Sequence, residues 1–306
     1  MYNPVLTSRI HKLNCPSYQG VIYLKRDDEL SCTVSGSKVR KYSTLVPHII
    51  ENSFKKVGII GGQNSNNLLG LAQVLIEIGV RPIVFIKKIT HVTKGSNFDF
   101  LKLFVPARDI IEVDVDDWAS VEAFVEKQYS ELYDFLIPEG AKHFSALKGA
   151  ESLGTDIVRN FECIEKVPSH IFIDSGTGVT AGALIKSLGD QGYTGTVHVL
   201  DLVGSGFRFS DHYSKSEIES KLKVEVHRPE SQKAFGSIHS DIFNFIRDFA
   251  AKEGVLLDPV YSSKLLRFSL SYSKSYLARE RVLVVHSGGQ WALNGFHQAL
   301  FENNKG

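Results

Sequence analysis

Short apolar runs alternate with helical patterns along nearly the whole chain, and this alternation constrains the fold more than any other feature. Several runs are apolar throughout, which is typical of strands that helices cover on both faces. The alternation predicts an α/β fold with parallel or mixed sheets flanked by helices. The predicted strands are residues 21–25, 57–60, 82–86, 110–113, 135–138, 170–174, 196–201 and 281–285.

Three stretches between these runs have apolar residues at helical spacing, and they cover residues 65–79, 117–132 and 239–254. About eight strands in 306 residues fit two sheets better than one. A chain of this length is also expected to form two domains. No repeat, low-complexity tract or linker composition marks a boundary between them.

The balance of charge argues against nucleic acid or membranes as partners. The chain carries 35 basic and 34 acidic side chains, a formal charge of +1, so no strong field attracts a polyanion. No apolar run reaches the length of a signal peptide or a membrane span, and we expect a cytoplasmic protein. The three cysteines, Cys15, Cys32 and Cys163, lack CxxC spacing and HExxH is absent, so the sequence predicts no metal site.

A strand leads into a glycine-rich turn and a helix within residues 57–72, "VGIIGGQNSNNLLGLA". In open α/β sheets ligands bind at such points, because the helix N-terminus offers unpaired backbone N–H groups. Ser65, Asn66 and Asn67 are therefore either helix caps or ligands of a bound molecule, and the sequence leaves both open. A dinucleotide-binding oxidoreductase is disfavoured, because the GxGxxG spacing is absent.

Residues 171–188, "IFIDSGTGVTAGALIKSL", repeat this arrangement with Gly176, Thr177, Gly178 and Thr180 in and after the turn. Small residues rich in hydrogen-bond donors at a helix N-terminus predict a phosphate site. The GK[ST] ending of a nucleotide-binding P-loop is missing, which favours a monophosphate.

A third strand runs into a Gly-Gly turn in "RVLVVHSGGQWALNGF" (281–296). We expect His286 to be packed in the core, whereas Ser287 is a candidate ligand at the sheet edge. In "VSGSKVRKYSTLV" (34–46), Lys38 is either a solvated surface charge or a reactive amine held against a cofactor. A reactive lysine, a monophosphate site and hydroxyl groups at strand ends together suit pyridoxal 5'-phosphate, which bonds covalently to a lysine amine.

These motifs resemble those of the D-cysteine desulfhydrase and 1-aminocyclopropane-1-carboxylate deaminase family of fold-type II pyridoxal-phosphate enzymes, relatives of the tryptophan synthase β chain. "SGSKVRK" (35–41) resembles the family's Gly-Gly-Asn-Lys-x-Arg-Lys, with Ser35 and Ser37 in place of a glycine and the asparagine. The match implies that Lys38 carries the cofactor and that Lys41 reaches its phosphate.

Two further motifs imply how the cofactor and the substrate are held. "GGQNSNN" (61–67) resembles Gly-Gly-x-Gln-Ser-Asn-His/Gln. That resemblance assigns Ser65 and Asn67 to the substrate carboxylate, Ser65 also to proton transfer, and Asn66 to the cofactor's ring hydroxyl. "TGVT" matches the family's phosphate loop. The residues implied there are Thr177, Gly178, Val179 and Thr180.

"EGVLLDPVYSSKLL" (253–266) is the closest match to a family motif. The resemblance implies that Tyr261 contacts the substrate and takes part in catalysis, and that Ser262 and Ser287 contact the cofactor, Ser287 also the substrate. At these two serine positions the deaminases carry glutamate and leucine, and the desulfhydrases carry hydroxyl residues. A hydroxyl at the pyridine nitrogen gives a weaker electron sink, which suffices when thiolate leaves. Phe235 stands where both subfamilies usually have a tyrosine over the substrate.

The resemblance implies a pyridoxal-phosphate-dependent lyase that converts D-cysteine, a small amino-acid substrate, into pyruvate, ammonia and sulfide, and that forms a homodimer. It also implies a large cofactor-binding domain, residues 1–49 and 161–306, and a small α/β domain, residues 50–160. Two alternatives stay open. One is a 1-aminocyclopropane-1-carboxylate deaminase. The other is a protein that binds the cofactor without lyase activity, suggested by Ser37 and Phe235.

Overall fold

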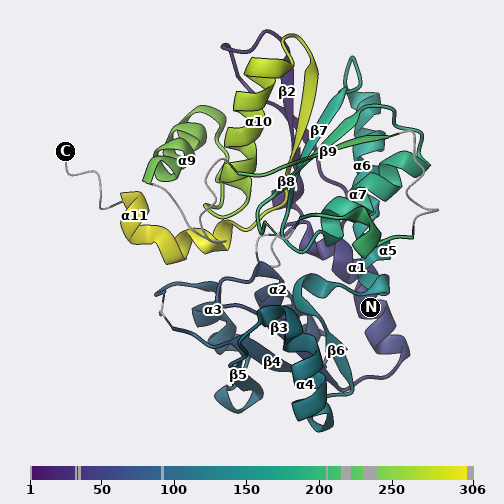
Figure 1. Ribbon diagram of the computed structural model, residues 1–306, viewed down its shortest axis with the longest axis vertical. Coiled ribbons are helices and arrows are strands. Elements are labelled where there is room, and N and C mark those ends of the chain that lie inside the picture. Colours follow the sequence, from purple (N-terminus) through teal and green to yellow (C-terminus); the bar gives the residue numbers. More distant parts are fainter. Residues whose placement is uncertain are drawn as a thin grey trace.

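The structure, a computed structural model, describes residues 2–31, 33, 36–90, 93–204, 206–214, 222–229 and 240–301. It has two halves, each built on one sheet with helices on its faces (Figure 1). Helix α1 (Lys38–Glu51) begins beside the larger sheet and packs onto the smaller one. Among the described residues, no helix combines the length and the apolar content that crossing a membrane requires.

The larger sheet has six strands in the order β1-β2-β10-β7-β8-β9. Strand β1 is antiparallel to β2, and the other neighbours pair in parallel. The carboxyl ends of the parallel strands therefore meet at one edge of the sheet. The strands are β1 Ile10–Lys12, β2 Val21–Arg26, β7 His170–Ser175, β8 Thr196–Asp201, β9 Lys223–His227 and β10 Arg281–His286.

Helices cover both faces of the larger sheet, because its central strands are apolar on both sides. Phe172 packs with α9 and α10, whereas its neighbours Ile171 and Ile173 pack with α6 and α7, since successive strand residues point to opposite faces. Figure 1 shows the two helix layers on either side of these strands. The helices are α6 Ser152–Asn160, α7 Val179–Asp190, α9 Ser240–Glu253 and α10 Ser262–Tyr276, followed by a 3₁₀ helix Gln290–Phe296 and α11 His297–Phe301.

The smaller sheet has four parallel strands in the order β5-β4-β3-β6. Helices α1, α2, α3 and α5 pack on one face, and α4 packs on the other. The elements are β3 Lys56–Gly61, α2 Asn66–Glu77, β4 Arg81–Lys87, α3 Asn97–Phe104, β5 Ile110–Val113, α4 Val121–Tyr129, β6 Phe135–Ile137 and α5 Phe144–Ala150.

The α/β class predicted from the alternating pattern is confirmed, and each of the eight predicted strands is a strand of the structure. Strands β1 and β9 were not predicted. The proposed division into domains stays a prediction. The two sheets are separate, and α1 contributes Tyr42, Leu45 and Ile49 to the core of the smaller one.

Four buried charged side chains tie α1 to the larger sheet. Arg40 donates to both carboxylate oxygens of Asp27 at 2.7 Å and to Asp156 of α6 at 2.7 Å. Lys25 of β2 donates to the same oxygen of Asp156 at 2.6 Å. The four side chains are at most 4% exposed. Arg40 therefore has a structural role, and it fixes the first turn of α1, where Lys38 lies.

Candidate active site

Lys38 lies at the carboxyl edge of the larger sheet. Strand β10 ends at His286 and leads directly into Ser287, and its neighbour β7 ends at Ser175. The backbone N–H of Ser37 donates to the carbonyl oxygen of Ser287 at 3.0 Å. This bond holds the first residue of α1, Lys38, beside the strand ends.

The Lys38 segment reaches this edge through a close approach at Gly36. Its φ is +52°, in the region that favours glycine, and a Cβ here would lie 2.2 Å from the carbonyl oxygen of Ser287. A larger residue would displace either this segment or the turn after β10. Gly36 therefore fixes the distance between the lysine and the sheet.

Lys38 is partly exposed, so a ligand can reach it, yet carboxylates surround its amine. Burial lowers the pKa of this amine, and the negative charges of Asp174 and Asp258 offset only part of that effect. A lowered pKa raises the fraction of neutral amine at neutral pH, and this form attacks carbonyl carbons. The structure thus places Lys38 in a partly buried position near carboxylates, and its role as a reactive amine stays a prediction.

Asp174 belongs to this site although the sequence analysis gave it no role. It lies near the end of β7, and its carboxylate accepts a hydrogen bond from the Ser287 hydroxyl at 3.2 Å. Burial raises the pKa of Asp174, and the positive charge of Lys38 opposes that rise. The available signal was a carboxylate at the end of the otherwise apolar run "HIFID", directly before the glycine-rich turn.

The turn after β7 forms the N-terminus of α7. Gly178, with φ +83°, is the N-cap residue of this helix. The Lys41 amine donates to the carbonyl oxygen of Gly140 at 2.9 Å, and a Cβ at Gly140 would lie 2.3 Å from Oγ1 of Thr177. Lys41 therefore lies close to the turn. Burial, and then the positive charge of Lys38, lower the pKa of Lys41 well below its usual value.

The N-terminus of α2 meets the same edge from the smaller sheet. Ser65 caps this helix, because its hydroxyl accepts from the backbone N–H of Leu68 at 3.1 Å. Asn66 lies close to the turn after β10, because a Cβ added to Gly289 of that turn would be 3.0 Å from the Asn66 amide nitrogen. Asn67 is buried, and its amide nitrogen has no hydrogen-bond partner within the described residues. A buried donor of this kind at a helix N-terminus suits a carboxylate.

Asp258 shapes the turn that presents Tyr261 and Ser262. Its carboxylate accepts the backbone N–H groups of both residues and the Ser262 hydroxyl, each at 2.7 Å. Ser262 begins α10. The Tyr261 ring lies beside Gly176, because a Cβ added to that glycine would be 3.4 Å from Cε1 of the ring. Burial raises the pKa of Tyr261, so its phenol is neutral at physiological pH.

Most of the residues predicted to form the site thus come together from both sheets. His286 is buried and shares a hydrogen bond of 2.9 Å with the carbonyl oxygen of Leu256, as expected of a packed core histidine. Ser35 and Phe235 lie outside the described residues. The residues gathered here are Lys38, Lys41, Ser65, Asn66, Asn67, Thr177, Gly178, Val179, Thr180, Tyr261, Ser262 and Ser287.

A pocket of about 550 Å³ lies at the opposite edge of the larger sheet, where β7 and β8 begin. Phe161, Pro168, Gly195 and Tyr193 are among its lining residues. It contains none of the residues predicted to act in catalysis or binding, and in open α/β sheets ligands bind at the carboxyl ends of strands. The candidate site is therefore the edge that holds Lys38.

The groups at this edge fit pyridoxal 5'-phosphate. Lys38 supplies an amine of lowered pKa for the covalent bond. The N-terminus of α7 and the nearby Lys41 amine supply a place for the phosphate. The unpartnered amide nitrogen of Asn67 supplies a donor for a substrate carboxylate.

We expect Lys41→Met to weaken the binding of pyridoxal 5'-phosphate roughly ten- to hundredfold, because one charge-assisted hydrogen bond contributes about 1.5–3 kcal/mol. Binding of pyridoxal, which has no phosphate, should change little. Absorbance titration of the apoprotein measures both affinities. Lys142→Met, at an exposed lysine close to Gly140 in the chain, is the control. An equal loss for the two ligands would contradict a phosphate contact of Lys41.

Comparisons with known proteins indicate the same cofactor. A family model described as pyridoxal-phosphate dependent enzyme matches residues 4–288. A D-cysteine desulfhydrase of Klebsiella pneumoniae is 22% identical over 294 residues, covering 91% of this chain and 90% of the relative. A 1-aminocyclopropane-1-carboxylate deaminase of Rhizobium leguminosarum is 24% identical over 300 residues, covering 90% and 88%.

A solved structure shares the fold. The crystal structure of an ACC deaminase homologue superimposes with a TM-score of 0.82 at 19% sequence identity. The match covers 97% of this chain and 93% of that chain. The chain therefore shares its α/β fold with this solved structure over almost its full length.

Proposed function

The chain belongs to the family of pyridoxal-phosphate dependent enzymes, and from this premise we propose that it is a lyase that eliminates sulfide from D-cysteine. The observation that carries the proposal is the position of Lys38 at the sheet edge, where the charges of Asp174 and Asp258 act on its amine of lowered pKa. The likeness to a D-cysteine desulfhydrase supports the choice of substrate. The overall reaction turns D-cysteine and water into pyruvate, ammonia and sulfide.

Each proposed role follows from the position of a side chain. Bound pyridoxal 5'-phosphate would supply an electron sink for bond breaking at the substrate's α-carbon. Lys38 would hold the cofactor, and its amine would also move the substrate's α-proton with the help of Ser65. The free amide nitrogen of Asn67 would bind the substrate carboxylate. The neutral phenol of Tyr261 would donate a hydrogen bond over the turn at Gly176.

One observation favours a second candidate, a 1-aminocyclopropane-1-carboxylate deaminase. The hydroxyl of Ser287, which is proposed to contact the cofactor, donates a hydrogen bond to the Asp174 carboxylate. A carboxylate therefore lies next to a residue of the proposed cofactor site. A carboxylate near the pyridine nitrogen strengthens the electron sink, which opening a cyclopropane requires. Relatives named as deaminases are as similar to this chain as those named as desulfhydrases.

A direct assay separates these candidates. The purified holoenzyme is incubated with D-cysteine, L-cysteine and 1-aminocyclopropane-1-carboxylate, and sulfide, pyruvate and 2-ketobutyrate are measured. We expect sulfide and pyruvate in equal amounts from D-cysteine. Formation of 2-ketobutyrate alone would establish the deaminase instead. A coloured protein that turns over none of the three, nor a wider panel of D- and L-amino acids, would be a cofactor-binding protein without lyase activity.

We expect Asp174→Asn to shift the pH profile of the covalent reaction of Lys38 to lower pH. The Asp174 charge raises the pKa of the Lys38 amine, so removing that charge increases the fraction of neutral amine at a given pH. The rate at which the apoprotein combines with pyridoxal 5'-phosphate, followed by absorbance from pH 6 to 10, measures the shift. Asp114→Asn, at an exposed carboxylate on the smaller sheet, is the control, and identical profiles for both variants would contradict the coupling.

The assembly and the domain division are proposed from the family resemblance, and the location from the lack of a long apolar run in the sequence. We propose a homodimer in the cytoplasm, acting on a small amino acid rather than on nucleic acid or membranes. The two sheets support a division into a large domain, residues 1–49 and 161–306, and a small domain, residues 50–160. Light scattering of the purified protein tests the dimer.

A further inference from the structure

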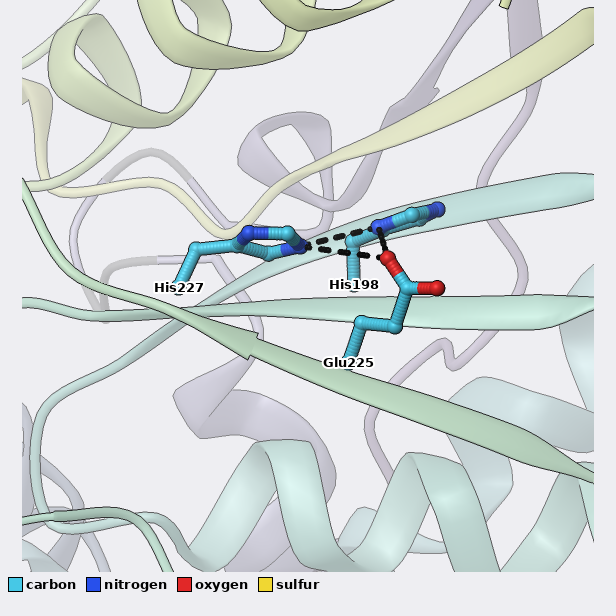
Figure 2. A group of neighbouring side chains, drawn as sticks. All are labelled: His198, Glu225 and His227. Carbon is cyan, nitrogen blue, oxygen red and sulfur yellow. Dashed lines mark hydrogen bonds and ion pairs between the residues drawn. The ribbon is translucent and has the colours of Figure 1, made fainter. Parts of the chain in front are cut away.

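Two imidazole groups and one carboxylate converge on the larger sheet (Figure 2). Tyr272 of α10 contacts all three, so they lie on the face of the sheet that α10 covers. His198 on β8 pairs in register with Glu225 on β9. His227 follows two residues after Glu225, so both point to the same face of the strand. Strand pairing alone therefore brings these three side chains together.

The three donor atoms form a triangle of the size that a metal ion requires. Nδ1 of His198 lies 3.0 Å from Nε2 of His227 and 3.4 Å from Oε2 of Glu225. Nε2 of His227 lies 3.8 Å from the same oxygen. Donors at 2.0–2.2 Å from a tetrahedral zinc ion lie roughly 3.3–3.6 Å apart. Shifts of a few tenths of an ångström would convert this triangle into a coordination face.

The polarity of β9 is the reverse of what an amphipathic edge strand should show. Glu225 and His227 are 28% and 17% exposed and face the helix layer, whereas Val224 and Val226 are 38% and 47% exposed. Packing would favour the opposite arrangement, with the valines covered. The polar groups on the covered face bond to one another, to Tyr272 and to Lys223, and a bound cation would be a further partner for them.

Neighbouring groups orient the donor side chains. Nε2 of His198 shares a hydrogen bond of 2.9 Å with His170, and its Nδ1 shares one of 3.0 Å with Nε2 of His227, which a bound metal ion would replace. The Tyr272 hydroxyl of α10 donates to Oε2 of Glu225 at 3.2 Å. Such outer partners orient metal ligands.

We propose that His198, Glu225 and His227 bind one divalent transition-metal ion, zinc by its donor set, with water as the fourth ligand. Two neutral imidazoles and one carboxylate are ligands that zinc prefers. The ion ties the edge strand β9 to β8 beneath α10 and has a structural role. The sequence predicted no metal site, because its ligands become neighbours only when β8 and β9 pair.

The experiment uses holoenzyme that has been treated with a chelator, freed of the chelator and kept without cysteine, since cysteine itself binds zinc. Zinc bound per chain is measured after equilibrium dialysis, and its affinity by competition with a coloured chelator. We expect one zinc ion per chain and a rise of the unfolding temperature with zinc, because the ion binds only the folded chain. His297→Gln, at an exposed histidine on α11, should bind zinc as the wild type does.

Three variants assign the ligands. His170→Gln keeps the three donors and removes an outer partner, so we expect roughly a 10- to 100-fold loss of zinc affinity. His227→Gln and Glu225→Gln should lose more than that, while an unchanged cofactor absorbance shows that they are folded. Absence of stoichiometric zinc in the wild type, or equal affinity in His227→Gln, would overturn the proposal. A hydrogen-bonded ladder of His170, His198 and His227 would then account for the cluster, and the proposed lyase activity would be unaffected.

Discussion

Lys38→Ala is expected to lower the turnover of D-cysteine by more than about 10³-fold, because the proposed mechanism uses the same amine as the covalent anchor of the cofactor and as the proton carrier. We expect no rescue by Lys41, the other lysine of α1, because its amine is held by the carbonyl oxygen of Gly140. The visible absorption band of the bound cofactor should disappear in the variant. Sulfide release and the absorption spectrum measure the two effects.

A chemical label distinguishes loss of the amine from loss of the fold. Borohydride reduction of the wild-type holoenzyme, followed by peptide mapping, should place the cofactor on the peptide that contains Lys38. Lys56→Ala, at an exposed lysine at the start of β3, should retain both the activity and the label. Labelling of another lysine, or a Lys38→Ala protein with the activity of the wild type, would refute the assignment.

Arg40→Met is expected to destabilise the protein by about 3–5 kcal/mol, the effect of removing one partner from a buried ion cluster. Methionine fills much of the arginine's volume but removes the guanidinium from two buried carboxylates, so that Asp27 keeps only the Ser8 hydroxyl as a donor. Urea unfolding followed by circular dichroism measures the loss. Arg267→Met, which removes the ion pair of an arginine that is 48% exposed, should cost at most about 1 kcal/mol. Equal losses in the two variants would refute the special role of the cluster.

The contribution of this cluster should depend on pH. Burial alone would raise the pKa of Asp156, but hydrogen bonds from Lys25, the Ser8 backbone and Arg40 outweigh it and lower that pKa. A carboxyl whose folded pKa is lowered contributes its full stability above its unfolded pKa and loses it as the pH falls through the folded pKa. The difference in unfolding free energy between wild type and Arg40→Met should therefore shrink below the usual range of aspartate pKa values, near pH 4.

The sequence predicted the strands that carry the site because they are central and apolar. "HIFID" and "RVLVV" are β7 and β10, buried between two helix layers. Strand β1 has only three residues, too few for a pattern. Strand β9 has no continuous apolar run and was therefore missed, although its alternation of valine with polar residues is typical of a half-exposed strand.

The candidate site was predictable where its residues follow one another in a short segment of the chain, as with Lys38 and the turn at Gly178. It was not predictable where the partners are distant in the chain. The hydrogen bond between Ser287 and Asp174 joins β10 to β7, and the contact between Gly140 and Thr177 joins the two halves. Such contacts depend on the packing of the sheets, which no local pattern encodes.

Helix α1 is packed against both halves of the molecule. Its apolar side is embedded in the core of the smaller sheet, while Arg40 is locked to Asp27 and Asp156 beside the larger one. A hinge rotation of one half against the other would have to break these ion pairs or shear that core. We therefore expect substrates to enter through rearrangement of side chains and turns around Lys38, with the two sheets keeping a constant relative orientation throughout the catalytic cycle.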